Sequence, residues 1–254
     1  MGDATSTAKT NSSGGTTIRP EEAAHFSSLA REWWNAKGPM ASLHEVNPVR
    51  LSFLREAIDG HWGSDIRSAT PLEGKAAIDV GCGAGLVCEP MARLGADVTG
   101  VDASAENVGV AAAHAEATGL DVRYMAGELA SLNLGTFDLV TSFEVIEHVS
   151  DKAAFLAQLA AHLKPDGLLV MSTPNRTAAS RLLLVEAAER VGYVPRGTHD
   201  WNDFVTPDEL ADLLADAGLE MGVPRGIAWR PGKGLHLSDD MSLNYAFTAR
   251  PRAA

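Results

Sequence analysis

The sequence predicts an α/β fold, in which helices cover both faces of a doubly wound, mostly parallel β-sheet. Residues 75–172 alternate short apolar runs with amphipathic stretches, which is typical of parallel strands joined by right-handed helical crossovers. The first apolar run, 76–80, ends at a cluster of glycines, as a buried parallel strand does beside a ligand-binding turn. A chain of 254 residues is long enough for one such domain with additions.

The other strands and helices follow from the same periodicity. Strands are expected at 97–101, 122–125, 137–142, 168–172 and 242–249. Helices are expected at 21–34, 48–58, 86–94, 105–118, 152–163 and 206–217. Because Pro90 removes a backbone donor, the helix that contains it is expected to begin late or to bend.

The chain is expected to form a single domain behind a disordered tail. The tail is residues 1–19, which are rich in Ser, Thr and Gly. In the domain, 20–254, residues 20–74 are expected to form an N-terminal helical cap. Residues 177–205 interrupt the strand–helix rhythm after the fifth strand, and we expect this insertion to face the substrate or a membrane.

Charge and cysteine content limit the classes of function. A formal net charge of −12 without a basic stripe argues against a nucleic-acid partner and favours a small-molecule substrate. No run approaches the roughly 18 apolar residues that a membrane-spanning helix needs. Cys82 and Cys88 match neither a disulfide framework nor a metal-binding spacing, so a cytoplasmic location is expected.

The glycine-rich segment 81–85 has the position of a cofactor loop. It follows a strand and precedes a helix, and Asp102 at the tip of the next strand can accept hydrogen bonds from both hydroxyls of a ribose. A nicotinamide dehydrogenase would share these features. Its fingerprint is G-x-G-x-x-G, however, and Gly85 comes one residue too early. A cationic sulfonium cofactor without phosphates fits better, with Asp79 near its amino group.

Four segments together resemble the class I S-adenosylmethionine-dependent methyltransferases. They are 79–85, 101–102, 137–140 and 163–167. The resemblance implies a Rossmann-like sheet of seven strands and S-adenosylmethionine as cofactor.

Flanking segments resemble one methyltransferase family in particular, the ubiquinone-biosynthesis O-methyltransferases. They are 30–34, 43–50, 143–149, 172–176, 197–200 and 240–245. The resemblance implies methyl transfer to a phenolic hydroxyl of a polyprenylated catechol-type intermediate, at both O-methylation steps. A methyltransferase for another small phenol or a carboxylate, and a non-catalytic S-adenosylmethionine-binding module, are the alternatives.

The same resemblance implies a set of cofactor-binding residues, namely Arg50, Gly81, Gly83, Asp102 and Phe143. For Arg50 the chemistry is independent support, because a guanidinium pairs bidentately with a carboxylate such as that of the cofactor. The alternative for Arg50 is a solvated residue on a helix surface.

Glu144, Glu147 and His148 are candidate ligands of a divalent cation, Mg, Mn or Zn. Their i, i+3, i+4 spacing puts them on one face of a helical turn, and the family is considered metal-assisted. A cation chelated by both catechol oxygens would lower the pKa of the attacking hydroxyl. The alternative is that the acids only complement a helix dipole. His148 is then the candidate general base, with His199 second.

Segment 179–194 combines an apolar face with flanking arginines. It is expected either to lie on an anionic membrane surface, which would place the protein peripherally at the inner membrane, or to cover the active site. A quinone-biosynthesis enzyme complex is a further expected partner.

Overall fold

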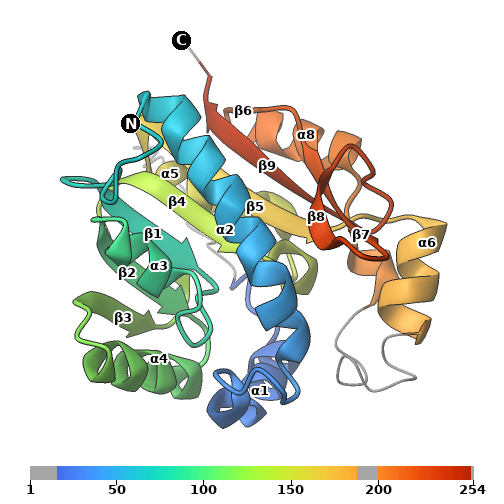
Figure 1. The fold of residues 1–254 in the computed structure, drawn as a ribbon, viewed down its shortest axis with the longest axis horizontal. Helices are drawn as coiled ribbons and strands as arrows, with labels where there is room; N and C mark the ends of the chain where they lie inside the picture. Colours follow the sequence, from blue (N-terminus) through green and yellow to red (C-terminus); the bar gives the residue numbers. More distant parts are fainter. Residues whose placement is uncertain (1–15, 188–199, 253–254) are drawn as a thin grey trace, which may run out of the picture.

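The structure, a computed structural model, describes residues 16–187 and 200–252 and confirms the predicted α/β fold (Figure 1). In chain order the described strands are β1 (Ala76–Val80), β2 (Asp97–Asp102), β3 (Val122–Ala126), β4 (Phe137–Phe143), β5 (Leu163–Pro174), β6 (Leu219–Met221), β7 (Arg225–Arg230), β8 (Gly234–Ser238) and β9 (Asn244–Pro251). They form one sheet of order β3-β2-β1-β4-β5-β9-β7-β8, with β6 paired to β9. The first five strands are parallel, and β9 runs antiparallel to β5.

The described part of the sheet has nine strands, where seven were expected. Seven strands make up the row from β3 to β7, and β6 and β8 are the additions. The short strand β6 pairs with the outer part of β9, and β8 forms an antiparallel hairpin with β7. Periodicity missed β6, which has only three residues, and also both strands of the β7–β8 hairpin. The Pro231-Gly232 pair is a turn signal that marks the hairpin.

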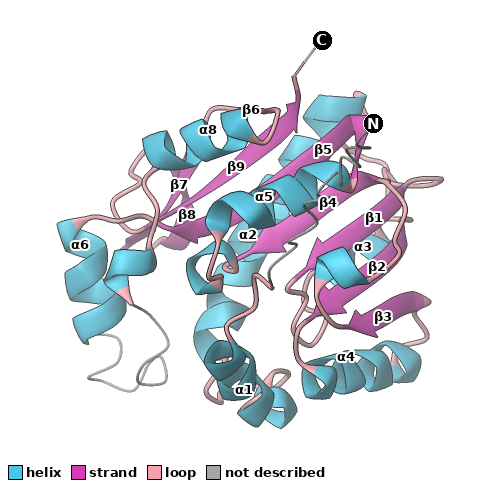
Figure 2. Ribbon diagram, turned by 180° about the vertical axis from the view of Figure 1, so that it is seen from behind, coloured by secondary structure: helices cyan, strands magenta, loops and turns pink. Residues whose placement is uncertain are grey.

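Helices cover both faces of the sheet (Figures 1 and 2). The α-helices are α1 (Pro20–Ser28), α2 (Ala41–Trp62), α3 (Cys88–Arg93), α4 (Ala105–Ala117), α5 (Lys152–Ala161), α6 (Ala178–Ser180) and α8 (Pro207–Asp216). One core cluster joins α2 and α3 to the sheet, and a second joins α5 and α8 to it. Helices on both faces bury β1 and β4 almost throughout, and β1 is accordingly apolar except at Asp79.

Two N-terminal boundaries differ from the predictions. Helix α2 begins at Ala41 and contains Pro48, which was expected at its start. The buried side chains of Phe53, Leu54 and Ile58 stabilise this helix, and packing offsets the loss of the one hydrogen bond that a proline removes. The expected helix at 21–34 divides into α1 and a 3₁₀ turn, Ala30–Glu32.

The last residues of the predicted disordered tail, 16–19, are ordered in the structure. Thr17 is buried and donates a hydrogen bond to Glu128, and Arg19 forms a 2.6 Å ion pair with Asp203. Residues 16–19 therefore pack against the domain. Residues 1–15 lie outside the described part of the chain.

Helix α3 starts at Cys88, later than the predicted 86, as the position of Pro90 suggested. After α6 the chain continues as a π-helical segment, Arg181–Ala187, and residues 188–199 lie outside the described part. In the described ranges, no helix is long and apolar enough to cross a membrane.

Candidate functional site

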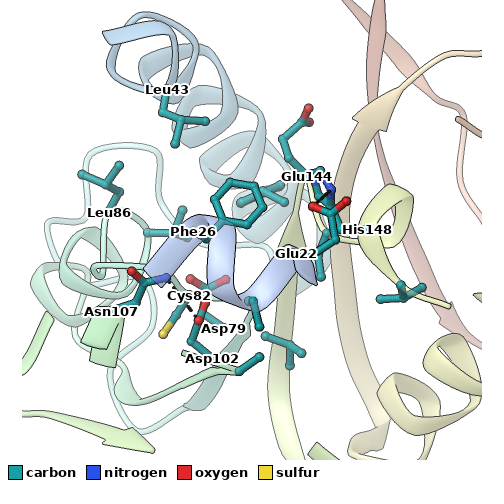
Figure 3. Close-up of a pocket in the computed structure, with 18 of the residues that line it drawn as sticks. Glu22, Phe26, Leu43, Asp79, Cys82, Leu86, Asp102, Asn107, Glu144 and His148 are labelled. Carbon is teal, nitrogen blue, oxygen red and sulfur yellow. Dashed lines mark hydrogen bonds and ion pairs between the residues drawn. The ribbon is translucent and has the colours of Figure 1, made fainter. Parts of the chain in front are cut away.

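A cavity of about 410 Å³ lies at the carboxyl ends of β1, β2 and β4, beneath α1 and α2 (Figure 3). One part is bordered by the cofactor loop, with Gly81, Asp102 and Asn107 among its lining residues. Another part is apolar and is lined by Leu183, Leu184, Ile227, Leu235 and Leu243. Glu144 and His148 also line the cavity. The cavity thus offers polar groups for a nucleoside and an apolar surface for a second ligand.

The glycines of the loop are required by close packing. Gly81 has a φ of 77°, and a Cβ there would lie 2.3 Å from a methyl group of Val145. Gly83 has a φ of 52°, and a Cβ there would lie 2.4 Å from the Trp33 ring. Any side chain at either position would strain the backbone and displace a neighbour. Gly81 lines the cavity, whereas Gly83 is absent from the residues that do.

The carboxylate of Asp102 holds the loop and the start of α4 together. It accepts hydrogen bonds from the backbone N–H of Gly83 at 2.8 Å and of Ser104 at 2.9 Å, and from the amide of Asn107 at 3.3 Å. Burial raises the pKa of Asp102, although these bonds oppose the shift. The buried Oδ1 of Asn107 has no hydrogen-bond partner among the described residues. An acidic acceptor and an unsatisfied amide oxygen at one wall fit the hydroxyls and amine of an adenosine.

Asp79 is buried below the loop and also lines the cavity. Its carboxylate accepts a 2.7 Å hydrogen bond from the hydroxyl of Thr141. Burial raises the pKa of Asp79 to about 6, and the hydrogen bond from Thr141 limits the shift. A cationic amino group nearby would favour the ionised carboxylate.

Arg50 reaches the cavity from α2 and pairs with Glu144. Its Nη2 lies 3.0 Å from Oε1 of Glu144, and the two side chains are only 6% and 15% exposed. Glu144 follows the last residue of β4 with a φ of 55°, the only positive value of a non-glycine residue in the described ranges. Ser172 and Asn244 donate hydrogen bonds to the same carboxylate. Sequence reasoning expected Arg50 near the cofactor but missed this partner.

His148 is paired with a residue of the N-terminal helix. Its Nδ1 lies 3.1 Å from Oε2 of Glu22, and the Phe26 ring packs edge-on against the imidazole at 5.2 Å (Figure 3). Burial lowers the pKa of His148, but the contact with Glu22 and the charges of Glu147 and Glu144 outweigh it, so that the pKa is raised. Glu22 thus orients the imidazole through its contact with Nδ1.

Comparison with known proteins agrees with this site. A family model described as a methyltransferase domain matches residues 55–222. The ubiquinone biosynthesis O-methyltransferase of Azorhizobium caulinodans is 43% identical over 92% of this chain and 94% of its own length. That of Cereibacter sphaeroides is 44% identical over 93% and 98%. The chain belongs to the ubiquinone biosynthesis O-methyltransferase family. It is therefore an S-adenosylmethionine-dependent methyltransferase, as predicted.

Solved structures resemble this family member in fold. Magnesium protoporphyrin IX methyltransferase from Synechocystis PCC 6803, with bound SAH, has a TM-score of 0.63 and 20% identity, and the match covers 91% of this chain and 98% of that one. A possible histamine N-methyltransferase from Thermotoga maritima also has a TM-score of 0.63, with 16% identity and coverage of 91% and 100%. The class I fold that the sequence predicted is thus confirmed.

The three predicted metal ligands of this family member do not share a helical face. The chain turns sharply at Glu144, and Ile146–His148 is a separate 3₁₀ turn, so the spacing of an α-helix does not apply. Glu147 is 2% exposed, accepts a hydrogen bond from Thr173 and is absent from the cavity lining. Burial, together with the charge of Glu144, raises its pKa to about 7.

The donor set therefore does not form a preassembled metal site. Within 16–187 and 200–252, no three His, Cys, Asp or Glu side chains are grouped so that they could hold a metal ion.

Of the predicted site residues, Arg50, Gly81, Asp102, Phe143, Glu144 and His148 all line one cavity. Gly83 is not among them, but its backbone N–H donates a hydrogen bond to the carboxylate of Asp102, which does line the cavity. Sequence reasoning missed Glu22 and Asn107. Asn107 had a signal, since it lies in the first turn of a helix next to the acid-tipped strand. The second candidate base, His199, lies outside the described residues.

Proposed function

We propose that this protein transfers the methyl group of S-adenosylmethionine to a phenolic hydroxyl of a polyprenylated catechol-type intermediate in ubiquinone biosynthesis, at both O-methylation steps. The observation that carries the proposal is that one cavity joins the cofactor-loop residues to His148 and to an apolar part. The names of relatives that are 43–44% identical over most of the chain support the same reaction.

The cofactor would occupy the part of the cavity beside the loop. Asp102 would accept hydrogen bonds from the ribose hydroxyls, and Phe143 would lie along the adenine. The guanidinium of Arg50 would pair with the carboxylate of the cofactor. To do so, it would either contact Glu144 and the cofactor at once or break its ion pair with Glu144. When bound, S-adenosylmethionine supplies an electrophilic methyl group on a positively charged sulfur.

His148 would act as the general base that takes the phenolic proton. It lines the cavity, and Glu22 orients its ring and stabilises the imidazolium that forms. The apolar wall would exclude water from the attacking oxygen. A phenolate generated beside the methyl group needs no further activation, because the leaving thioether is neutral.

The apolar part of the cavity would receive the start of the prenyl chain. Leu183 and Leu184 contribute from the segment after α6, and Ile227 and Leu235 contribute from the β7–β8 hairpin. Each isoprene unit would bury apolar area there, which favours a long-chain substrate over a bare catechol.

The same segment would bring the protein to an anionic membrane. Leu182 is 57% exposed and Leu183 is 48% exposed, next to Arg181. Vesicles with and without anionic lipid test this part: a variant with Leu182→Ser and Leu183→Ser should sediment less with anionic vesicles. If the variant sediments as much as the unaltered protein, the segment does not bind the membrane and only covers the cavity.

Methylation of a synthetic catechol with a short prenyl chain tests the proposed function. We expect the purified protein to give a methylated product by mass spectrometry, and His148→Asn to lower kcat by about 10²–10⁴-fold, the usual contribution of a general base. S-adenosylhomocysteine should still raise the melting temperature of that variant. Stabilisation of the unaltered protein without turnover on any phenol would instead favour a non-catalytic binding module.

The divalent cation of the sequence analysis is a separate hypothesis, which the arrangement of Glu144, Glu147 and His148 does not favour. Exhaustive chelation tests it. If chelation abolishes turnover and Mg, Mn or Zn restores it, a metal is supported. Glu144 would then have to break its ion pair with Arg50 in order to bind the metal. Full turnover after chelation would reject it.

A further inference from the structure

Leu86, the residue directly after the cofactor loop, has a carbonyl without a main-chain donor. In a regular helix the N–H of residue 90 donates to the carbonyl of residue 86, but position 90 is a proline. On either side the regular pattern holds, since Glu89 N donates to Gly85 O at 3.1 Å and Met91 N to Val87 O at 3.1 Å. The carbonyl of Leu86 therefore lacks the bond that both of its neighbours have.

A side chain of the N-terminal cap supplies this missing bond. Asn47, on α2, donates from Nδ2 to the carbonyl of Leu86 at 3.0 Å. Asn47 also lines the cofactor cavity. The donor that Pro90 removes from α3 is thus replaced from another helix.

A second cap residue binds the loop in the same way. Trp34 donates from Nε1 to the carbonyl of Ala84 at 3.1 Å, and its ring stacks on His114 of α4 at 3.5 Å. Beside it, the Trp33 ring fills the space over Gly83. Both tryptophans and Asn47 belong to the segments 30–34 and 43–50, in which the proposed chemistry gives a role to Arg50 alone.

We propose that Asn47 and Trp34 are positioning residues that hold the cofactor loop in its binding conformation. Satisfying the Ala84 and Leu86 carbonyls from the cap would preorganise the loop, so that less conformational entropy is lost when the cofactor binds. The cap is then part of the cofactor site. The proposal rests on S-adenosylmethionine as cofactor, and on no particular methyl acceptor.

Calorimetric binding of S-adenosylhomocysteine tests the Asn47 bond. Asn47→Leu keeps much of the volume and removes the donor, and we expect the Kd to rise about tenfold, the equivalent of one hydrogen bond. Pro90→Ala restores an N–H opposite Leu86, so the double variant should return to within about twofold of the original Kd. In steady-state assays the KM for S-adenosylmethionine should follow the Kd, and the KM for the phenol should stay unchanged.

A pair of matched substitutions tests Trp34. Trp34→Phe removes the donor and keeps a ring against His114, and should raise the Kd about three- to tenfold. Trp62→Phe is the same change on α2, where the ring contacts Lys75 instead of the loop, and should leave the Kd unchanged.

Two results would overturn the proposal: an unchanged Kd in Asn47→Leu, or a raised Kd that Pro90→Ala does not restore. If Asn47→Leu alone does not fold, a folded double variant with the original Kd supports the proposal, and a weakened one overturns it. The binding assay contains no phenol, so failure to methylate any phenol would reject the proposed function without affecting this result.

Discussion

The guanidinium of Arg50 lies 3.0 Å from the carboxylate of Glu144 in a largely buried position, and Glu144 is held there in a left-handed backbone conformation. Ser172 donates a hydrogen bond to one oxygen of the same carboxylate, and Asn244 donates to both oxygens. A charged pair of this kind contributes less to stability than it costs to break, because one partner alone is an uncompensated buried charge.

This relationship predicts a non-additive effect on stability. Arg50→Met should lower the free energy of unfolding by about 3–5 kcal/mol, because the Glu144 charge is left unpaired. Adding Glu144→Gln should recover much of that loss, since the amide carries no charge. Urea denaturation measures both variants, and a double variant as unstable as the sum of its two single variants would contradict the expectation.

The pairing of His148 with Glu22 predicts a change in the pH profile. Glu22 raises the pKa of His148, so Glu22→Gln should lower that pKa. Because the base acts in its neutral form, the acidic limb of kcat/KM should move to lower pH. The value of kcat on the plateau should fall, since the ring loses the partner that orients it. An acidic limb at its original pH would show that His148 is not the group that titrates.

Asp102 should be required mainly for cofactor binding. Asp102→Asn keeps the shape but turns an acceptor into a partial donor opposite the N–H groups of Gly83 and Ser104. Hydrogen bonds to a charged group are worth roughly 1.5–3 kcal/mol, so the Kd for S-adenosylhomocysteine should rise about 10- to 100-fold. Asp121→Asn, on the exposed surface, is the control and should bind as the unaltered protein does.

Asp79 should make stability depend on pH in an unusual direction. Its folded-state pKa, about 6, lies above the usual aspartate value of 3.8, so the folded protein binds the proton more tightly than the unfolded chain. Its contribution to stability is complete below pH 3.8 and is lost as the pH rises through 6. Between pH 4 and 7 the unaltered protein should lose about 2 kcal/mol relative to Asp79→Asn. Parallel stability curves for the two proteins would contradict this.

Local patterns were sufficient for the sheet and for one side of the cofactor site. Short apolar runs located β1 to β5, and the acid at the tip of β2 could be placed beside the loop because parallel strands end at the same edge. Of the family segments 30–34 and 43–50, only Arg50 could be given a role from the sequence. Pro90 was read correctly as a late helix start, without any sign of what replaces its missing donor.

Tertiary packing determines which side chains of the site contact one another. Each functional contact joins residues from different elements of the chain. Glu22 pairs with His148, Arg50 pairs with Glu144, and Asn47 donates a hydrogen bond to Leu86. The spacing of 144, 147 and 148 predicted a shared helical face, and the left-handed turn at Glu144 removed it. Periodicity describes which face of one element is buried. Which side chain lies opposite depends on how helices and strands dock, and that is set by the packing of the whole domain.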